Sequence, residues 1–234
     1  MFVIQQEVCL PATDMGITLI RASKFHLWYT GEPIPYRMQE DSSHVRANDI
    51  PVGSVEWTEN VSGRSLKVYN IPEQLRRPPY VLRTVFEANK FILEACLQSG
   101  PLFVKSAVKN KAFAADIIRS VVEVPEQEKY FCSEPVTFTE EWRAFVYRDR
   151  VLDVKQYAGS WDQPLTKVES QWLNSLVRSR FVPLAAYTID FGRTKNGVEL
   201  VEIHNFVACG LYGFEDFESI ARMAKSAWKD ESAF

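Results

Sequence analysis

The feature that most constrains the fold is a pair of strand-like segments on either side of residues 195–197, Lys-Asn-Gly. Glycine in the last, left-handed position of a three-residue loop is common in β-hairpins. Counting outward from this loop places Asp190 opposite Glu202. Because side chains alternate along a strand, His204 should share their face of the hairpin. The other face is apolar and should pack on the core: Ile189, Phe191, Val201 and Ile203.

Two carboxylates directly opposite each other destabilise a sheet. At ~4 Å and an effective dielectric constant of about 20, their bare Coulomb repulsion is roughly 4 kcal/mol. A fold tolerates such a pair if one carboxyl group is protonated, if a basic side chain lies between them, or if a cation is bound. Carboxylate oxygens are ligands that suit Mg²⁺. The alternative is an ordinary solvated face, with the strand register shifted by one residue.

The composition is that of a folded protein with a sizeable core. The chain has 234 residues, of which 46% are hydrophobic and 24% are charged. No apolar run approaches the ~18 residues of a membrane span, so we expect no membrane association. A formal net charge of −3 argues against general nucleic-acid binding, which depends on neutralising phosphates.

The cysteines and the first residues indicate a cytoplasmic location. Four cysteines lie far apart in the sequence, without a C-x-x-C pair. The first seven residues lack the basic and apolar regions of a signal peptide. We therefore expect reduced thiols in a cytoplasmic protein.

The alternation of strands, helices and antiparallel hairpins predicts the α+β class. Residues 76–79, Arg-Arg-Pro-Pro, resist both helix and strand pairing. They divide the chain into an amino-terminal domain, residues 1–78, and a larger domain, residues 79–234. Strands are predicted at 66–71, 102–105, 131–138, 141–147 and 151–157, helices at 85–97, 112–122, 168–176 and 217–228, a loop at 37–49, and a turn entering a strand at 50–57.

Basic residues form a second pattern in the larger domain. Lys105 ends a short buried strand, and Arg143 should face Lys155 if their hairpin closes with three residues. Two opposed cations favour an anion between them, as the two carboxylates favour a metal ion. A triphosphate with its Mg²⁺ would satisfy both requirements. Each residue alone is more often structural, and a lone lysine at a strand end is usually solvated.

Several common sites are excluded. The sequence contains neither G-x-x-x-x-G-K nor G-x-G-x-x-G, so a P-loop or a Rossmann turn does not bind a nucleotide here. The three histidines form no recognisable catalytic triad or zinc set.

The order of these residues resembles the ATP-grasp superfamily. It runs Phe-Val-Lys105, Glu141-x-Arg143, Lys155, Asp190 and Val-Glu202-Ile-His-Asn. The closer resemblance is to the small R-two-K clade, through residues 50–56 and 202–212. The Glu-Trp-Arg-Ala-Phe-Val segment at 141–146 is also similar to ATP-grasp chaperones that help build a translation-initiation factor. The resemblance covers residues 50–215 and implies an ATP-grasp fold with a small amino-terminal α/β, pre-ATP-grasp domain.

The resemblance also implies roles for individual residues. ATP would be held by a set of five residues: Lys105 and Lys111 near the phosphates, the backbone from Glu134 to Val136 around the adenine, and Glu141. Arg143 and Lys155 would be the catalytic pair that meets the phosphates or an acyl phosphate. Mg²⁺ would be held by Asp190, Glu202 and Asn205.

Two departures from the family pattern bear on these roles. The third metal ligand is usually an asparagine two residues after the glutamate, and His204 occupies that place with Asn205 beside it. A bulge at Ile203-His204 would turn Asn205 inward. A regular strand would instead place His204 in the site and favour Mn²⁺. The loop after Lys105 also lacks the glycines that many members use to close over the phosphates.

The expected function is an ATP-dependent carboxylate–amine (or thiol) ligase that acts through an acyl phosphate. The sequence does not identify its carboxylate and amine substrates. A peptide or a protein is among the candidates. The alternative is an ATP-binding assembly factor or interaction protein without ligase turnover. A third reading is a binding module whose cleft has lost its function.

Overall fold

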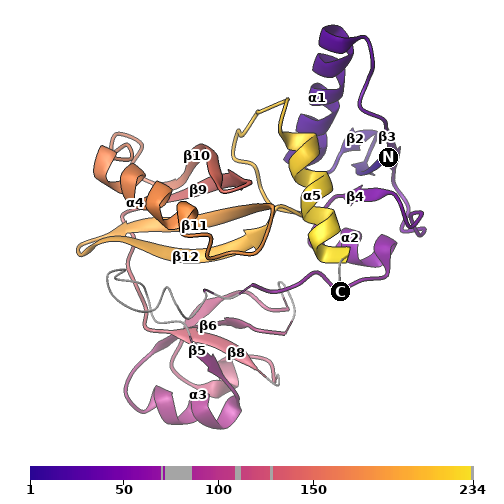
Figure 1. Cartoon of the computed structure of the whole chain (residues 1–234). Helices are drawn as coiled ribbons and strands as arrows, with labels where there is room; N and C mark the ends of the chain where they lie inside the picture. The colour runs from indigo at the N-terminus through magenta and orange to yellow at the C-terminus, as the bar shows by residue number, and fades with distance from the viewer. Residues whose placement is uncertain (70, 72–85, 109–111, 127–128, 233–234) are drawn as a thin grey trace.

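The computed structural model describes residues 1–69, 71, 86–108, 112–126 and 129–232. Over these residues the chain forms three four-stranded sheets and the helices α1 to α5 (Figure 1). None of the described helices is long and apolar enough to cross a membrane. All four cysteines are free thiols.

The amino-terminal sheet is built around one central strand. Its strands are β1 (Phe2–Glu7), β2 (Leu10–Pro11), β3 (Tyr36–Gln39) and β4 (Ile50–Val52), with β1 antiparallel to β2 and parallel to β3 and β4. Two helices follow strands of this sheet: α1 (Asp14–Thr30) and α2 (Val55–Ser62). Each helix has a side-chain N-cap and ends at a left-handed glycine, as helix termini commonly do.

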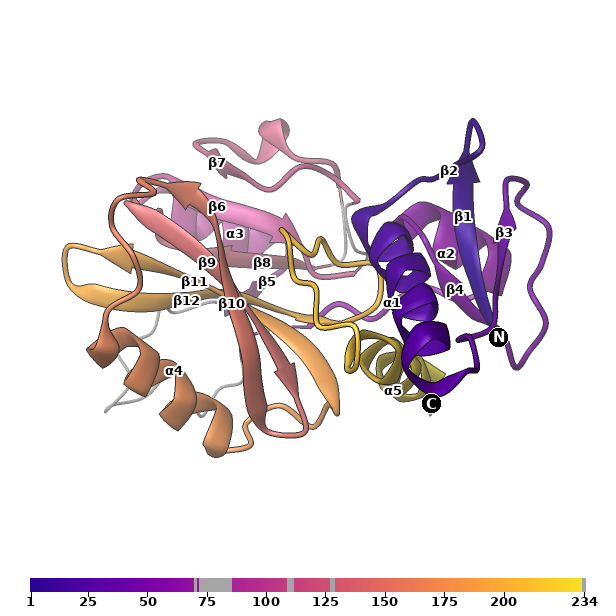
Figure 2. The same ribbon diagram turned by 90° about the horizontal axis from the view of Figure 1, so that it is seen from above.

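The central sheet contains both predicted hairpins. It runs in the order β10-β9-β11-β12, all antiparallel. The strands are β9 (Glu140–Tyr147), β10 (Arg150–Gly159), β11 (Ala186–Thr194) and β12 (Gly197–Asn205). Helix α4 (Lys167–Arg178) packs against this sheet through Leu173, Leu176 and Val177 (Figure 2). Of the predicted apolar face, Ile189, Phe191 and Ile203 are buried in this core. Val201 is only half-buried, because the register shift places Leu200 opposite Phe191 in the core instead.

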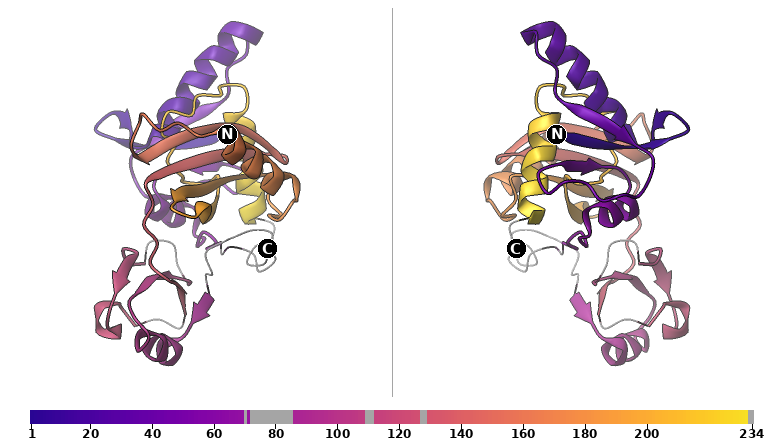
Figure 3. Two further views of the ribbon diagram at one scale, coloured as in Figure 1. Left: turned by 90° about the vertical axis from the view of Figure 1, so that its left-hand side faces the viewer. Right: turned by 90° about the vertical axis from the view of Figure 1, so that its right-hand side faces the viewer.

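The third sheet lies beside the central one (Figure 3). Its order is β5-β8-β6-β7, and its pairs are antiparallel. The elements are β5 (Phe86–Ala88), α3 (Lys90–Leu97), β6 (Leu102–Ser106), β7 (Asp116–Ile118), the 3₁₀ turn η2 (Val121–Glu123) and β8 (Tyr130–Ser133). This sheet has its own apolar cluster around Leu93, Val104 and Tyr130.

Helix α5 (Ile220–Ser232) joins the amino-terminal and central sheets. It contacts α1, β4 and β11, and one apolar cluster draws on all of these parts. That cluster includes Phe2 and Ile4 from β1 and Phe145 from β9. The predicted division at residue 78 lies outside the described residues and stays a prediction.

Several predicted elements are wrong. Residues 112–122 do not form a helix, because β7 pairs with β6 within this range. Residues 66–69 lie outside any strand, and the strand predicted over 131–138 ends at Ser133. Residues 50–57 enter a helix after a strand, and residues 37–39 of the predicted loop belong to β3. Helices α3 and α5 begin later than predicted, at Lys90 and Ile220.

Both central hairpins have tighter turns than predicted, yet they keep the predicted pairs. Tyr147 pairs with Arg150 and Thr194 pairs with Gly197, so two residues connect the strands in each hairpin. A register shift then follows in each, between Val151 and Asp153 and between Asp190 and Phe191. Because each bulge adds one residue to one strand, Arg143 still faces Lys155 and Asp190 still faces Glu202.

Candidate active site

Asp190 is neutralised by an arginine from the neighbouring strand. β9 places Arg143 opposite Asp190, and the guanidinium binds both carboxylate oxygens, with Nε 2.7 Å from Oδ1 and Nη2 2.6 Å from Oδ2. Both residues are buried, at 7% and 2% exposure. Burial disfavours the charge on Arg143, but the hydrogen bonds and charge of Asp190 raise its pKa above the usual value. Arg143 therefore compensates the charge of Asp190, one of the two carboxylates that were predicted to repel each other.

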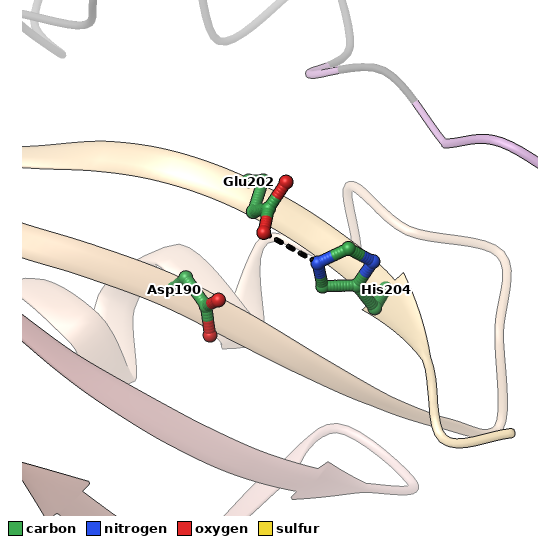
Figure 4. Close-up of side chains that lie close together, drawn as sticks. All are labelled: Asp190, Glu202 and His204. Carbon is green, nitrogen blue, oxygen red and sulfur yellow. Dashed lines mark ion pairs between the residues drawn. The ribbon is translucent and has the colours of Figure 1, made fainter. Parts of the chain in front are cut away.

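Glu202 pairs with a lysine and a histidine. Lys105 Nζ lies 2.9 Å from Glu202 Oε2, and His204 Nε2 lies 2.6 Å from Oε1 (Figure 4). Burial opposes the ionisation of this carboxyl group, but the charges and hydrogen bonds of His204 and Lys105 hold its pKa well below the usual value. Lys105 reaches Glu202 from the third sheet, so this ion pair bridges two sheets.

Asp190, Glu202 and His204 form a group that could hold a metal ion. One potential ligand atom from each residue lies within 4.8 Å of the others, all on the predicted face of the hairpin (Figure 4). The two carboxylates offer the hard oxygen ligands that Mg²⁺ prefers, whereas an imidazole nitrogen suits Mn²⁺ and later metals better. The donor set therefore fits a divalent cation.

The bulge expected at Ile203-His204 is absent, and this corrects the expected orientation of Asn205. The β11–β12 pairing is regular at these positions, with Thr188 opposite His204. Asn205 consequently turns away from the two carboxylates. Its Nδ2 donates to Ala227 O at 3.1 Å and to Glu231 Oε1 at 2.8 Å on α5. His204, not Asn205, shares the face of Asp190 and Glu202.

A cavity of about 540 Å³ lies where the third sheet meets the end of β12. Its charged lining includes Lys105, Arg143 and Glu202, together with His204. The remaining wall is formed by Val55, Leu66–Tyr69, Ser106, Phe113–Ala115, Asn205, Val207–Gly210, Tyr212 and Glu231. A cavity of this volume is within the usual range for small-molecule sites. Acidic and basic groups from two sheets thus face one space.

Arg143 also contacts the loop that follows β12. The arginine Nη1 donates to Gly210 O at 3.0 Å, and the guanidinium lies 5.0 Å from the centre of the Tyr212 ring. Tyr212 in turn stacks on Tyr157 at 5.1 Å. The backbone of Tyr212 is left-handed, with φ of 48°. Arg143 therefore links Asp190 to the wall of the cavity.

Among the described residues, the other predicted site residues, Asp190 included, lie outside the cavity lining. Lys155 faces Arg143 across the strands, but its Nζ pairs with Asp153 at 2.9 Å. Glu141 accepts a hydrogen bond from the Tyr157 hydroxyl at 2.9 Å. Glu134 is exposed and Val136 is half-buried after β8. Lys111 lies outside the described residues, so the assigned roles of these residues stay predictions.

Sequence reasoning missed most of the cavity wall, including the polar residues Tyr69 and Glu231. Tyr69 falls in a segment that was predicted to be a strand, and Glu231 lies in the last turn of α5. Neither belongs to a recognisable motif. Neither side-chain alternation nor motif spacing predicts a contact between the end of α5 and the irregular segment 66–69.

The sequence matches the model of a known family, the ATP-grasp domain of the R-two-K clade, family 2, over residues 80–221. The match spans more than half of the chain, so the protein belongs to this family. The resemblance expected from the motifs is confirmed. No curated protein sequence matches the chain.

Solved structures share the ATP-grasp fold at low sequence identity. A RimK domain ATP-grasp protein from Sphaerobacter thermophilus is 10% identical, with a TM-score of 0.58 over 100% of both chains. D-alanine–D-alanine ligase from Bacillus anthracis is 10% identical, with a TM-score of 0.55 over 99% of this chain and 98% of the ligase. N5-carboxyaminoimidazole synthetase from Staphylococcus aureus, complexed with ADP, is 9% identical, with a TM-score of 0.55 over 96% of this chain and 76% of the synthetase. The predicted α+β, ATP-grasp fold is confirmed.

Proposed function

We propose that this protein is an ATP-dependent ligase that joins a carboxylate to an amine or a thiol through an acyl phosphate. The observation that carries the proposal is the convergence of Lys105, Arg143 and Glu202 on one cavity between two sheets. Family membership adds support, since ATP-grasp is the shared fold of the ligases named above. A structure of the Bacillus anthracis ligase has been determined with ATP.

Lys105 would bind the phosphates of ATP. Its ammonium group borders the cavity and pairs with Glu202. A triphosphate carries more negative charge than one carboxylate, so it would draw Lys105 away from Glu202. This exchange would leave Glu202 available to a cation that arrives with the nucleotide.

Asp190, Glu202 and His204 would hold the divalent cation, which would supply neutralising charge to the transferring phosphoryl group. The chain's own contribution is to fix these ligands. The strand pairing of β11 with β12 holds the two carboxylates opposite each other. Arg143 orients Asp190 through both of its carboxylate oxygens.

The proposed reaction has two steps. An oxygen of the substrate carboxylate attacks the γ-phosphorus, and the bond to the ADP oxygen breaks. The neutral amine or the thiol then attacks the acyl carbon, the carbon–oxygen bond to phosphate breaks, and the proton of the nucleophile passes to the departing phosphate or to water. Lys105 and Arg143, which line the cavity, would compensate the negative charge that both steps concentrate there.

A second candidate function is an ATP-binding assembly factor without ligase turnover. The specific observation in its favour is His204, which stands at the family's asparagine position and lies 2.6 Å from Glu202. In this function the nucleotide would be a structural ligand that orders the cavity. The protein partner would then recognise the ATP-bound form.

A coupled assay of ADP and phosphate release distinguishes the two functions. The purified chain is incubated with Mg-ATP and pairs of carboxylates and amines, including amino acids and short peptides. A ligase releases one ADP and one phosphate for each bond formed, and only when both substrates are present. Binding of Mg-ATP without ADP release under any pair would favour the assembly factor.

A further inference from the structure

The last turn of α5 holds the end of β12 through one buried carboxylate. Glu231, which is only 9% exposed, accepts a hydrogen bond at Oε1 from Asn205 Nδ2 at 2.8 Å. The same amide nitrogen also donates to Ala227 O at 3.1 Å. Both N–H groups of Asn205 are therefore used by α5, and the bond to the charged acceptor is the stronger of the two.

Glu231 is itself fixed by a segment that is distant in the sequence. Its Oε1 also accepts a hydrogen bond from the Tyr69 hydroxyl at 3.1 Å, and its Oε2 accepts one from the backbone amide of Lys67 at 3.2 Å. Because of these two bonds, the carboxylate cannot follow Asn205 if that side chain moves away. The orientation of Asn205 therefore depends on the tertiary fold and not on its own strand alone.

The amide oxygen of Asn205 gains nothing from this arrangement. Asn205 Oδ1 is buried and accepts no hydrogen bond from the residues that the structure describes. A buried amide oxygen is normally satisfied by a donor, and Mg²⁺ binds oxygen ligands of this kind. If Asn205 turned toward Asp190 and Glu202, its oxygen could bind a cation. The observed orientation therefore requires an interaction that holds it.

A single local change separates the two orientations of Asn205. Asn205 is the last residue of β12, and His204 faces the two carboxylates because the strand is regular there. A bulge at residues 203–204 would exchange the two side chains and disturb only the last two pairs of the β11–β12 ladder. β12 is an edge strand of the central sheet, where bulges are common.

We propose that Glu231 is a positioning residue that selects His204, rather than Asn205, as the third metal ligand. This inference rests on the metal group of the proposed function, and it concerns which metal that group prefers. Glu231 acts by keeping Asn205 on α5, which leaves His204 beside Asp190 and Glu202. An imidazole nitrogen favours Mn²⁺, whereas an amide oxygen favours Mg²⁺. Glu231 would thereby set the metal preference through Asn205.

The test compares Mg²⁺ and Mn²⁺ as partners of ATP and identifies the ligand directly. Calorimetry of the full chain gives the affinities for Mg-ATP and Mn-ATP. Electron spin-echo spectroscopy of the bound Mn²⁺ detects a coordinated imidazole nitrogen, and His204→Gln supplies the reference spectrum without it. The wild type should bind Mn-ATP more tightly than Mg-ATP and should show the nitrogen signal.

Glu231→Ala should free Asn205 and change the ligand. The nitrogen signal should disappear, and the preference for Mn²⁺ should fall about tenfold or more, the effect of one hydrogen bond to a charged group on an equilibrium. The double variant Glu231→Ala, Asn205→Ala should regain the nitrogen signal, because no amide then competes with His204. Glu231→Asp, whose shorter side chain withdraws the carboxylate, should change both readouts in the same direction and serves if Glu231→Ala does not fold.

Two control variants should keep the wild-type metal preference and nitrogen signal. Glu231→Gln retains an acceptor oxygen for the amide of Asn205. Asp230→Ala removes the neighbouring carboxylate, which accepts a hydrogen bond from the Ala185 backbone amide at 2.9 Å rather than from Asn205. This variant weakens the attachment of α5 without releasing Asn205.

Three results would overturn the inference. The first is wild-type protein that binds Mn-ATP without the nitrogen signal. The second is a wild-type preference and signal in Glu231→Ala or Glu231→Asp, or the same loss in Asp230→Ala, because Glu231 would then be a structural residue only. The third is a double variant that stays without the signal, which would mean that the end of β12 is merely loosened. Failure of the wild type to bind ATP with either metal would instead refute the proposed function.

Discussion

Asp190→Asn is expected to destabilise the protein, although it removes one of two opposed carboxylates. Considered alone, the repulsion between Asp190 and Glu202 predicts a stabilising effect. In the structure, however, the charge of Glu202 is already compensated by Lys105. Asp190 instead accepts two hydrogen bonds from Arg143, and both residues are buried. An asparagine retains one acceptor but turns its NH₂ group toward a guanidinium N–H.

The size of the effect follows from the burial of the pair. Removing one partner of a buried ion pair costs about 3–5 kcal/mol, because the other charge remains buried and unpaired. For a chain of this length, each kcal/mol lowers the melting temperature by roughly 2–4 °C. We therefore expect a fall of roughly 6–20 °C for Asp190→Asn in the absence of nucleotide.

Urea and thermal unfolding of the metal-free protein measure this difference. The control is the double variant Arg143→Met, Asp190→Leu, which removes both charges and should recover most of the lost stability. An Asp190→Asn variant that is as stable as the wild type, or more stable, would refute the reasoning. It would mean that the repulsion from Glu202 outweighs the pair with Arg143.

Two further predictions concern the metal site and the pH dependence of stability. Because His204 shares the face of the two carboxylates, Mn²⁺ should support ATP binding better than Mg²⁺, and His204→Asn should reverse this preference in calorimetric titrations. Hydrogen bonds from Arg193 lower the pKa of Glu169 to about 2 from 4.5. Its stabilising effect is complete above pH 4.5 and is lost as the pH falls toward 2, so Glu169→Gln should show a shallower acid loss of stability in urea unfolding at stepped pH.

The predicted pairs in the two hairpins could be found from the sequence because they depend on register alone. Alternation and the distance to the turn placed Asp190 opposite Glu202 and Arg143 opposite Lys155. The turns are one residue shorter than predicted, and a bulge in each hairpin compensates. The sequence could not distinguish a three-residue turn from a two-residue turn followed by a one-residue bulge, because both place the same residues opposite each other.

The failures arise where tertiary contacts decide the local structure. Residues 112–122 have apolar spacing typical of a helix, but Ile117 and Ile118 are β-branched and pair with the edge of β6. The irregular segment 66–69 is held by Glu231 of α5, more than 160 residues away in the sequence. No pattern in the sequence encodes that contact.

The orientation of Asn205 was missed for a similar reason. The family pattern favoured an inward asparagine, which required a bulge at Ile203-His204. The bulge lies nearer the turn, between Asp190 and Phe191, so the end of β12 keeps regular alternation. Asn205 then faces α5, where Ala227 O and Glu231 accept its two N–H bonds.

The binding of Mg-ATP to the cavity is the most direct test of the central claim. Calorimetry measures the affinity, and at ~100 times the dissociation constant the bound nucleotide should stabilise the folded protein by roughly 2.7 kcal/mol. Lys105→Ala should lose most of this stabilisation while remaining folded, because Lys105 is the basic side chain that borders the cavity from β6. An unchanged melting temperature of the wild type in millimolar Mg-ATP, or full binding by Lys105→Ala, would contradict the account.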